Sequence, residues 1–483
     1  MRGDAEHGPL GLQVTRRDFL EQAGVAAAGG LLGAACHPCS TNVAGSILEP
    51  VTGVNCSTVH TFENWSHTIT FQPRRFCRPR TEAEVIAIVK DALATKTHVR
   101  TQGAGHSFAQ LLPTSDTLLT LDDLTVPITV NGHRATVPGG IRLKNLIPEL
   151  RARGLGLKNL GSITEQSIAG AFSTGTHGTG VGLGAISTQV VGMRLVDGHG
   201  DLRTITEQDT EQLSAARINV GALGIITQVT LDCVDDYQLE YSAYLTTLDA
   251  VLRHIDQLVQ ENDRVLFWWL LLPGCPRDTT ILITKNVVGH PVSDVLKQAA
   301  DEAIPSSSQV LSKEPGTLRK FSTQSRKDEF KRIVHYVGPY SQVLTIPLLP
   351  VFHRECEYAI PVAKTVEAIK SMREFVEEGD VSLLLPVEVR FVAQDDILLS
   401  PCHEGPVSYI GASTLVNSTE VFERFEPLMK QLGGRPHWGK NYTITREEAM
   451  QLYPSTYKRF CDVRDALDPN RVFANSMLTD LFA

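Results

Sequence analysis

The sequence has no excess of positive charge, no long apolar run and no paired cysteine motif. Its net charge of −9 argues against the basic surface with which proteins bind nucleic acids or anionic membranes. The one mildly apolar run, rich in alanine and glycine, ends near Ala35 and is too short to span a bilayer stably. With 483 residues and 42% hydrophobic residues, the chain is long enough for two or three globular domains.

The nine cysteines are odd in number and scattered along the chain. Cys36 and Cys39 form one isolated CxxC unit, and no second unit at zinc spacing accompanies it. The cysteines therefore predict neither a disulfide framework nor a metal site. The sequence also lacks a GxSxG elbow and an HExxH motif, which disfavours a hydrolase or a metalloprotease.

The first residues, 1–44, are typical of a twin-arginine export signal. Arg16 and Arg17 precede the short apolar run, a pattern read by the machinery that exports folded proteins. An ordinary helix N-terminus with two arginines is the alternative. Lipid attachment at Cys36 is a further option, although Gly33 fits that pattern poorly. The segment predicts an exported protein, periplasmic or otherwise extracytoplasmic.

A glycine-rich turn is the feature around which the chain is organised. Gly103, Ala104 and Gly105 are followed at once by His106 and Ser107. A GxG turn exposes backbone N–H groups that suit a phosphate or pyrophosphate. It is not the dinucleotide fingerprint GxGxxG, because no third glycine follows. Taken alone, the turn is equally typical of a solvent-facing loop.

The remaining pattern indicates alternating helices and strands. A capping box at residues 81–84 opens an expected helix over 85–94, and a strand at 99–101 leads into the glycine turn. A further helix is expected over 143–153. The glycine clusters stop at about residue 238, where longer strands and helices begin, so we place a domain boundary there.

Four ordered motifs together resemble one family. They are Gly103–Ser107, the run Asn159–Gly180 (NLGSITEQSIAGAFSTGTHGTG), Gly221–Thr227 (GALGIIT) and His437–Lys440 (HWGK). The chain resembles the aldonolactone oxidoreductases, which include gulonolactone and arabinonolactone oxidases, within the vanillyl-alcohol oxidase-like flavoproteins. The resemblance covers residues 65–483.

This resemblance implies an α+β protein. Residues 65–238 would form a PCMH-type FAD-binding domain of two subdomains. Residues 239–483 would form a substrate-binding cap with a mixed or antiparallel sheet and a C-terminal return to the flavin. In the family's oxidases the histidine after GxG is bound covalently to the flavin, here His106. The expected FAD contacts are Gly103, Ala104, Gly105, His106, Ser107, Gly161, Ser162, Ser167, Gly170, Gly175, Thr176, His177, Ile226 and His437.

The expected catalytic residues are Glu388, Arg390, Lys440 and Ser162. Glu388 and Arg390 alternate on one strand and so share a face. They could form a purely structural ion pair, but the resemblance favours an ExR pair that binds substrate hydroxyls above the flavin. Lys440 and Ser162 match family residues close to the substrate and the flavin's reactive centre. His437 could equally be a packing residue, against its neighbour in the HWGK motif.

One glycine bears on the electron acceptor. The family's dehydrogenases carry alanine at the position of Gly161, and a glycine there would leave open space through which dioxygen approaches the flavin. Gly161 thus favours an oxidase, although a tight turn explains it almost as well. Alditol oxidases place a histidine on the strand after ExR, whereas residues 409–411 here are Tyr-Ile-Gly. This difference disfavours polyol substrates.

The sequence therefore predicts FAD-dependent oxidation of a sugar-derived 1,4-lactone at the hydroxyl next to its carbonyl. Dioxygen would be the acceptor, and the products would be hydrogen peroxide and an ascorbate-type compound. A dehydrogenase with a cytochrome, quinone or dye acceptor and an alditol oxidase are alternatives. A secreted carbohydrate-binding protein without turnover is the non-enzymatic alternative. No metal and no nucleic-acid partner are expected.

Overall fold

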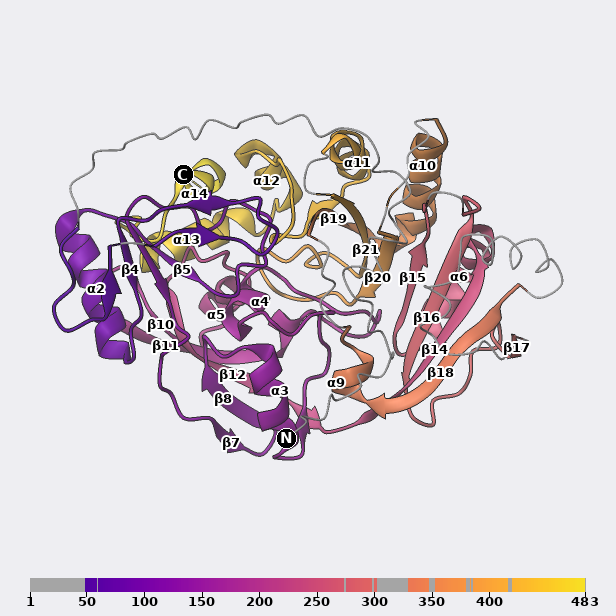
Figure 1. Ribbon diagram of the computed structural model, residues 1–483, viewed down its shortest axis with the longest axis horizontal. Coiled ribbons are helices and arrows are strands. Elements are labelled where there is room, and N and C mark those ends of the chain that lie inside the picture. Colours follow the sequence, from indigo (N-terminus) through magenta and orange to yellow (C-terminus); the bar gives the residue numbers. More distant parts are fainter. Residues whose placement is uncertain are drawn as a thin grey trace, which may run out of the picture.

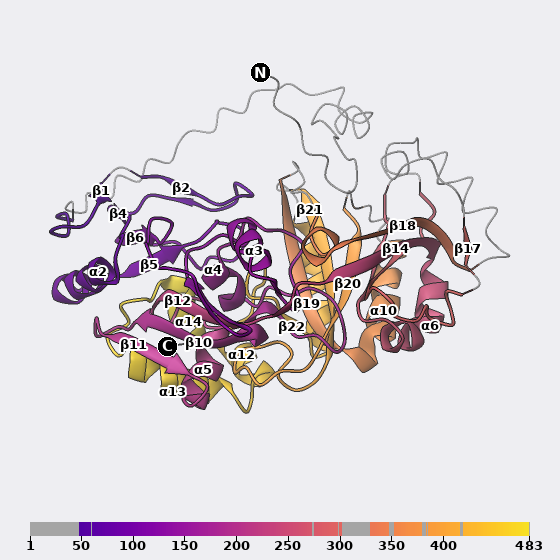
Figure 2. The same ribbon diagram turned by 90° about the horizontal axis from the view of Figure 1, so that it is seen from below.

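The computed structural model describes residues 48–482 except 59, 273–274, 298, 302–328, 347–351, 379–382, 384 and 416–418. The expected export signal, with Arg16, Arg17 and Cys36, lies outside the described residues. Figures 1 and 2 show the arrangement from two sides: the N-terminal half and the last helices form one part, and a long sheet with its own helices forms the other.

The first subdomain is a small sheet of order β1-β4-β6-β5 with one helix. β5 and β4 run parallel to β6, while β1 is antiparallel to β4. A separate two-stranded ribbon, β2-β3, precedes β4. The elements are β1 (Cys56–Ser57), β2 (Phe62–Glu63), β3 (Thr70–Phe71), β4 (Arg75–Cys77), α2 (Glu82–Thr95), β5 (Val99–Gln102) and β6 (Thr117–Thr120).

The helix expected over 85–94 is confirmed as α2. Its N-cap is Thr81, whose side chain accepts a hydrogen bond from the Glu84 backbone N–H at 3.2 Å. This contact satisfies one of the free N–H groups of the first turn. The helix ends at Lys96, which has a left-handed backbone with φ of 52°. The strand that it precedes, β5, leads directly into the glycine turn.

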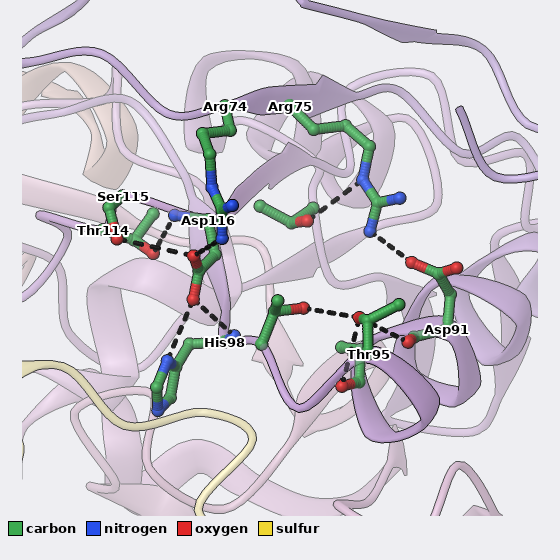
Figure 3. Close-up of polar contacts among 11 residues, drawn as sticks. Arg74, Arg75, Asp91, Thr95, His98, Thr114, Ser115 and Asp116 are labelled. Carbon is green, nitrogen blue, oxygen red and sulfur yellow. Dashed lines mark hydrogen bonds and ion pairs between the residues drawn. The ribbon is translucent and has the colours of Figure 1, made fainter. Parts of the chain in front are cut away.

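Buried polar contacts connect the elements of this subdomain (Figure 3). Arg75 on β4 is only 1% exposed and pairs with Asp91 on α2 at 2.6 Å. Asp116 accepts hydrogen bonds from Arg74 at 2.5 Å and from the His98 backbone N–H at 2.8 Å. A buried guanidinium needs such partners, so these contacts fix α2 against the sheet.

Cys56 and Cys77 form a disulfide between β1 and β4. The expectation that the cysteines support no disulfide is therefore wrong. The two residues are 21 positions apart, and they meet because the antiparallel register pairs Cys56 with Cys77 directly. No spacing rule reveals that register in the sequence.

The second subdomain is built on an antiparallel sheet of order β11-β10-β12-β8-β7. Helix α3 begins at Leu143 as expected and ends at Arg151, two residues earlier than expected. The elements are β7 (Thr129–Asn131), β8 (Arg134–Pro138), α3 (Leu143–Arg151), β9 (Leu155–Gly156), α4 (Ile168–Ser173), η1 (Ile186–Gln189), β10 (Val190–Val196), β11 (Leu202–Thr206), α5 (Thr210–Arg217), β12 (Ile225–Asp232) and β13 (Val234–Asp235).

From Gln238 onward the chain builds a sheet of order β17-β18-β14-β16-β15-β20-β21-β19-β22. All its pairs are antiparallel except β17 with β18. The strands are β14 (Gln238–Thr247), β15 (Val265–Trp269), β16 (Thr279–Val287), β17 (Ala300–Asp301), β18 (Lys331–Pro339), β19 (His353–Pro361), β20 (Val387–Val392), β21 (Val407–Leu415) and β22 (Arg435–Pro436).

The two faces of this sheet have different roles. One face packs against helices α6, α10 and α11 through a large apolar cluster that includes Phe267, Val389 and Ile410. The other face turns toward the N-terminal half, as Figure 2 shows. The helical segments here are α6 (Leu248–Gln260), α9 (Tyr340–Val343), η2 (Val362–Lys364), α10 (Thr365–Glu378) and α11 (Glu420–Gln431). Because successive side chains of a strand point to opposite faces of the sheet, every second side chain faces the N-terminal half.

The last helices return to the N-terminal half. They are α12 (Arg446–Leu452), α13 (Tyr457–Leu467) and α14 (Ser476–Phe482). Phe460 and Phe482 lie in the same apolar core as the second subdomain, and α13 packs on α5. In Figure 2 these yellow helices lie beside the five-stranded sheet. Within the described residues, no helix combines the length and apolar character needed to cross a membrane.

Candidate active site

A cavity of about 480 Å³ opens where β5 ends and the glycine turn begins. Gly105 has a φ of 70°, and a Cβ added to Gly103 would lie 2.5 Å from Ser167 Oγ. Side chains at these positions would strain the turn or displace Ser167, so the turn requires glycine. The lining residues are His60, Thr61, Phe62, Glu63, Gln102, Gly103, Ala104, His106, Arg142, Lys144 and Glu165.

The polar groups of this cavity fit FAD. Among the described residues, His60 Nε2, Gln102 Oε1 and Arg142 Nη1 are buried without a hydrogen-bond partner. Buried polar atoms are normally paired, so three orphans in one lining indicate a polar ligand. Two cations, Arg142 and Lys144, also line the cavity and suit a pyrophosphate. These residues would hold the phosphate-bearing part of the cofactor.

His106 is held as a neutral imidazole at the cavity wall. Burial lowers its pKa to about 4, with Lys440 and Arg142 adding to the effect and Glu165 opposing it. The ring stacks on Trp65 at a centroid distance of 5.4 Å, and the Trp65 backbone N–H donates to the Gly105 carbonyl. An uncharged ring with a free nitrogen lone pair is the form that can act as a nucleophile.

The other expected FAD contacts divide into two groups. Gly103, Ala104 and His106 line the cavity, whereas Gly105, Ser107, Gly161, Ser162, Ser167, Gly170, Gly175, Thr176, His177, Ile226 and His437 are not among its lining residues. Ser167 is the N-cap of α4, and its Oγ accepts from the Gly170 N–H at 3.3 Å. Ile226 is part of the apolar core on β12.

The open space expected at Gly161 is not present. A Cβ there would lie 2.7 Å from Thr176 Cγ2, well inside van der Waals contact. Thr176 is itself fixed, because its Oγ1 accepts a hydrogen bond from Gln166 Nε2 at 3.0 Å. Gly161 therefore allows the segment around residue 161 to approach Thr176 closely. The expectation that this glycine leaves open space is corrected.

Glu388 and Arg390 on β20 face the N-terminal half and form an ion pair. Trp268 Nε1 donates to Glu388 Oε1 at 2.9 Å, and Arg390 donates to Ser162 Oγ at 3.0 Å. Arg390 also reaches the His177 carbonyl at 3.4 Å. Burial would raise the pKa of Glu388, but the Arg390 charge holds it below its ordinary value. The structure thus brings the expected Glu388, Arg390 and Ser162 together.

Lys440 joins the same region from the HWGK segment. It forms an ion pair with Glu355 on β19 and lies 5.5 Å from the ring centroid of Phe108. Its pKa is raised: burial lowers it, and the carboxylates of Glu355 and Glu357 more than compensate. Lys440 is therefore a permanent cation at the sheet face.

Gly411 provides the space in which these carboxylates gather. The register places it between Glu388 on β20 and Glu357 on β19. A Cβ on Gly411 would lie 3.3 Å from Glu355 Oε1 and 3.8 Å from Glu357 Oε1. β21, the strand after the Glu388–Arg390 strand in the chain, has Gly411 and no histidine at this point, as the sequence indicated. The neighbouring strand β19 supplies the acidic side chains Glu355 and Glu357.

His177, Glu357 and His437 form a buried group whose ligand atoms lie within 4.8 Å of one another. His177 Nδ1 contacts the Gly178 carbonyl at 2.9 Å, and a carbonyl only accepts, so Nδ1 carries a proton. His437 Nδ1 accepts the Gly439 N–H at 3.0 Å, so its Nε2 carries the proton. His177 Nε2 faces Glu357 Oε1 at 3.4 Å within this group.

His437 is deeply buried, as a packing residue would be, yet it also faces the charged group. Burial lowers its pKa to about 3, while the Glu357 charge opposes that shift. Glu357 is held ionised: burial would raise its pKa, but His177, Lys440 and His437 keep it well below its ordinary value. The ring of His177 stacks on Tyr409 at 3.7 Å.

Sequence reasoning missed Glu355, Glu357 and Trp268. The first two lie in the strand RECEYAIP, where carboxylates alternate with apolar residues. That is the same signal that identified Glu388 and Arg390, two charges on one face of a buried strand. Trp268 carries no such signal, because its role depends on the pairing of β15 with β20.

The fold and the cavity define the class of protein. Residues 73–206 match the FAD binding domain family. The structure of cholesterol oxidase from B. sterolicum has the same fold, with a TM-score of 0.72 and 17% identity over 91% of this chain and all of that one. The protein is an FAD-binding flavoprotein of the α+β, vanillyl-alcohol oxidase type, as expected.

Residues 229–481 match the D-arabinono-1,4-lactone oxidase family, and the chain belongs to that family. It is similar to mouse L-gulonolactone oxidase, with 29% identity over 87% of this chain and 98% of the relative. It is 31% identical to L-gulono-1,4-lactone dehydrogenase of Mycobacterium tuberculosis, over 86% of this chain and 97% of the relative. The protein is thus an FAD-dependent oxidoreductase.

Proposed function

We propose that the protein oxidises an aldono-1,4-lactone of the gulono, galactono or arabinono type at the hydroxyl next to the carbonyl. The observation that supports this most directly is the Glu388–Arg390 pair, joined by Arg390 to Ser162 of the FAD-binding half. The pair offers carboxylate acceptors and guanidinium donors on one rigid strand. Such a surface suits a small molecule with several hydroxyls and one carbonyl.

The residues of the chain have separate tasks in this reaction. Bound FAD supplies the hydride acceptor. Glu388 accepts hydrogen bonds from substrate hydroxyls and is oriented for this by Trp268 and Arg390. Arg390 and Lys440 provide fixed positive charge that stabilises an alkoxide oxygen as the hydroxyl is oxidised. Their cationic state is secured by carboxylate partners.

We infer further that dioxygen is the acceptor and that hydrogen peroxide and a 2-keto-lactone are formed. The keto-lactone would enolise to an ascorbate-type compound. The names of the relatives include both an oxidase and a dehydrogenase, so transfer to a cytochrome, quinone or dye is the second candidate. The test is a side-by-side measurement of peroxide formation and cytochrome c or dye reduction with the same lactone.

The neutral His106 ring supports a covalent bond to the flavin. Its burial and its position in the cavity lining make it a nucleophile held beside the cofactor. Denaturation in acid is the test: yellow colour that remains with a peptide containing His106 supports the bond. Flavin released into the supernatant contradicts it.

Export through the twin-arginine machinery to an extracytoplasmic compartment remains part of the proposal. The disulfide between Cys56 and Cys77 supports it, because disulfides persist mainly in oxidising compartments. Replacement of Arg16 and Arg17 by lysine should retain the protein in the cytoplasm, and cell fractionation would detect this. Unchanged fractionation of the double variant would contradict export by this route.

A panel of lactones, their open-chain acids and alditols tests the proposed substrate class. We expect anaerobic bleaching of the flavin absorbance with 1,4-lactones and not with alditols. Bleaching by alditols alone would replace the proposal with an alditol oxidase.

A further inference from the structure

Lys285 is a buried amine in the active-site sheet, and the proposed function gives it no task. It lies on β16 and is 8% exposed. Among the described residues, no hydrogen bond or ion pair reaches its Nζ. Burying an ammonium group without a hydrogen-bonded partner costs free energy, which favours the neutral amine at this position.

The register places Lys285 on the substrate face of the sheet. Two residues before it, Ile283 packs with Leu266, and Leu266 lies directly opposite Arg390. Leu282, the residue before Ile283, belongs to the apolar cluster on the helix-covered face. Because side chains alternate along a strand, Lys285 points to the same side as Arg390 and Glu388.

The surroundings of Lys285 favour its neutral form. Burial, together with the charges of Arg390 and Arg264, lowers its pKa to about 8, and only Glu388 acts in the opposite direction. On the β15 side its backbone N–H donates to the carbonyl of Arg264, a buried cation, at 2.9 Å. Its cross-strand partner on β14 is Tyr241, which stacks on Tyr336 of β18 at 4.9 Å. At mildly alkaline pH the side chain is therefore a free amine.

Three carboxylates and one histidine of the site are poorly suited to accept the substrate proton. Arg390 holds Glu388 ionised, and Glu357 is likewise held well below its ordinary pKa. Glu355 is engaged by Lys440. His437 already uses its acceptor nitrogen for a backbone N–H. Oxidation of an alcohol nevertheless requires a group that removes the hydroxyl proton.

We propose that the neutral amine of Lys285 is the general base that takes the hydroxyl proton of the lactone, an inference that rests on the proposed function. The substrate O–H bond breaks and an N–H bond forms on Lys285. The C–H electron pair leaves as hydride to the bound FAD, and the carbinol carbon becomes a carbonyl. Arg390 and Glu388 hold the substrate while Lys285 accepts the proton.

The first experiment compares wild type with K285M over a range of pH in anaerobic stopped-flow reduction by a lactone. The wild-type rate constant should rise with pH through about 8, because only the unprotonated amine accepts a proton. K285M should lose this rise and be slower by about 10²–10⁴-fold at pH 9. K158M is the matched control, since Lys158 is 41% exposed and paired with Asp232.

Two readouts separate a base from a fixed charge. Small primary amines should partly restore K285A, more strongly as the amine becomes more basic. Competitive labelling with acetic anhydride, followed by mass spectrometry, should give Lys285 of the flavin-loaded wild type an apparent pKa near 8. An ordinary lysine pKa, or a folded K285R variant as fast as wild type, would overturn the assignment.

The outcomes also distinguish this inference from the proposed function. If wild type reduces lactones and K285M keeps the same pH profile, only the role of Lys285 is lost. If wild type is reduced by no lactone, the proposed function fails, and the general-base role fails with it.

Discussion

His177 of the FAD-binding half and Glu357 of the long sheet meet in a buried contact, with Nε2 and Oε1 3.4 Å apart. His177 Nδ1 donates to the Gly178 carbonyl, so Nε2 is the ring nitrogen that faces Glu357. The contact joins the two parts of the molecule next to Arg390, which itself donates to the His177 carbonyl.

Replacement of Glu357 by glutamine should destabilise the protein. It removes a buried carboxylate charge on which His177, Lys440 and His437 act, and loss of one member of such a buried charged group costs about 3–5 kcal/mol in the free energy of unfolding. Urea denaturation at pH 7 of flavin-loaded wild type and E357Q measures the difference. The matched control is E207Q, since Glu207 pairs with Arg134 at the surface and should contribute at most about 1 kcal/mol.

The contribution of Glu357 should depend on pH in a definite direction. The folded-state pKa of Glu357 lies well below its ordinary value, so the stabilisation is complete above the unfolded carboxyl pKa of about 4.3. It is lost as the pH falls through the lower folded-state pKa. The gap between wild type and E357Q should therefore narrow below about pH 4. A gap that widens on acidification would contradict an ionised Glu357.

Replacement of Arg390 by methionine should impair chemistry while FAD still binds. The guanidinium touches Ser162, His177 and Glu388, whereas the cavity of the glycine turn lies elsewhere. We expect the rate of flavin reduction by lactone to fall about 10²–10³-fold, as for the loss of one charge-stabilising donor. Arg203→Met is the control, because Arg203 is 49% exposed and pairs with Asp197. Loss of flavin absorbance in R390M would instead indicate a cofactor-binding role.

The sequence could predict the parts of the site that are local in the chain. The turn Gly103–Ser107 and the alternation of Glu388 with Arg390 are each contained in five residues. Their spacing predicts local geometry, and the resemblance of four ordered motifs predicts their roles. The N-cap of α2 at Thr81 is local in the same sense, and the helix formed as expected.

What the sequence could not predict depends on strand order. Lys285 and Glu357 belong to β16 and β19, which the order β16-β15-β20-β21-β19 brings to either side of Arg390. Most neighbouring strands in this sheet, such as β15 and β20 or β21 and β19, are not consecutive in the chain, so no spacing rule reveals their pairing. The same holds for Gly411, whose missing side chain matters only because Glu355 and Glu357 project over it.

Removal of the disulfide should destabilise the first subdomain. Cys56 and Cys77 close a loop with a sequence separation of 21, for which the chain-entropy estimate is about 3 kcal/mol. The double variant C56S/C77S should unfold at lower urea than wild type, and dithiothreitol should shift wild type toward the variant. C233A is the control: Cys233 is a buried free thiol, so this variant keeps the disulfide and should shift with dithiothreitol as wild type does. A wild type that is insensitive to dithiothreitol would contradict this.

The variants of Gly161 separate packing from oxygen access. G161A alone should lower the free energy of unfolding by about 1–3 kcal/mol, because its Cβ meets the Thr176 methyl at 2.7 Å. T176S removes that methyl and keeps the hydroxyl that accepts from Gln166, so G161A/T176S should regain the stability. Reoxidation of the reduced flavin by dioxygen is then measured for all three variants in stopped flow. Slow reoxidation in the stable double variant would mean that residue 161 governs oxygen access, whereas slow reoxidation only in G161A would trace the effect to the displaced Thr176.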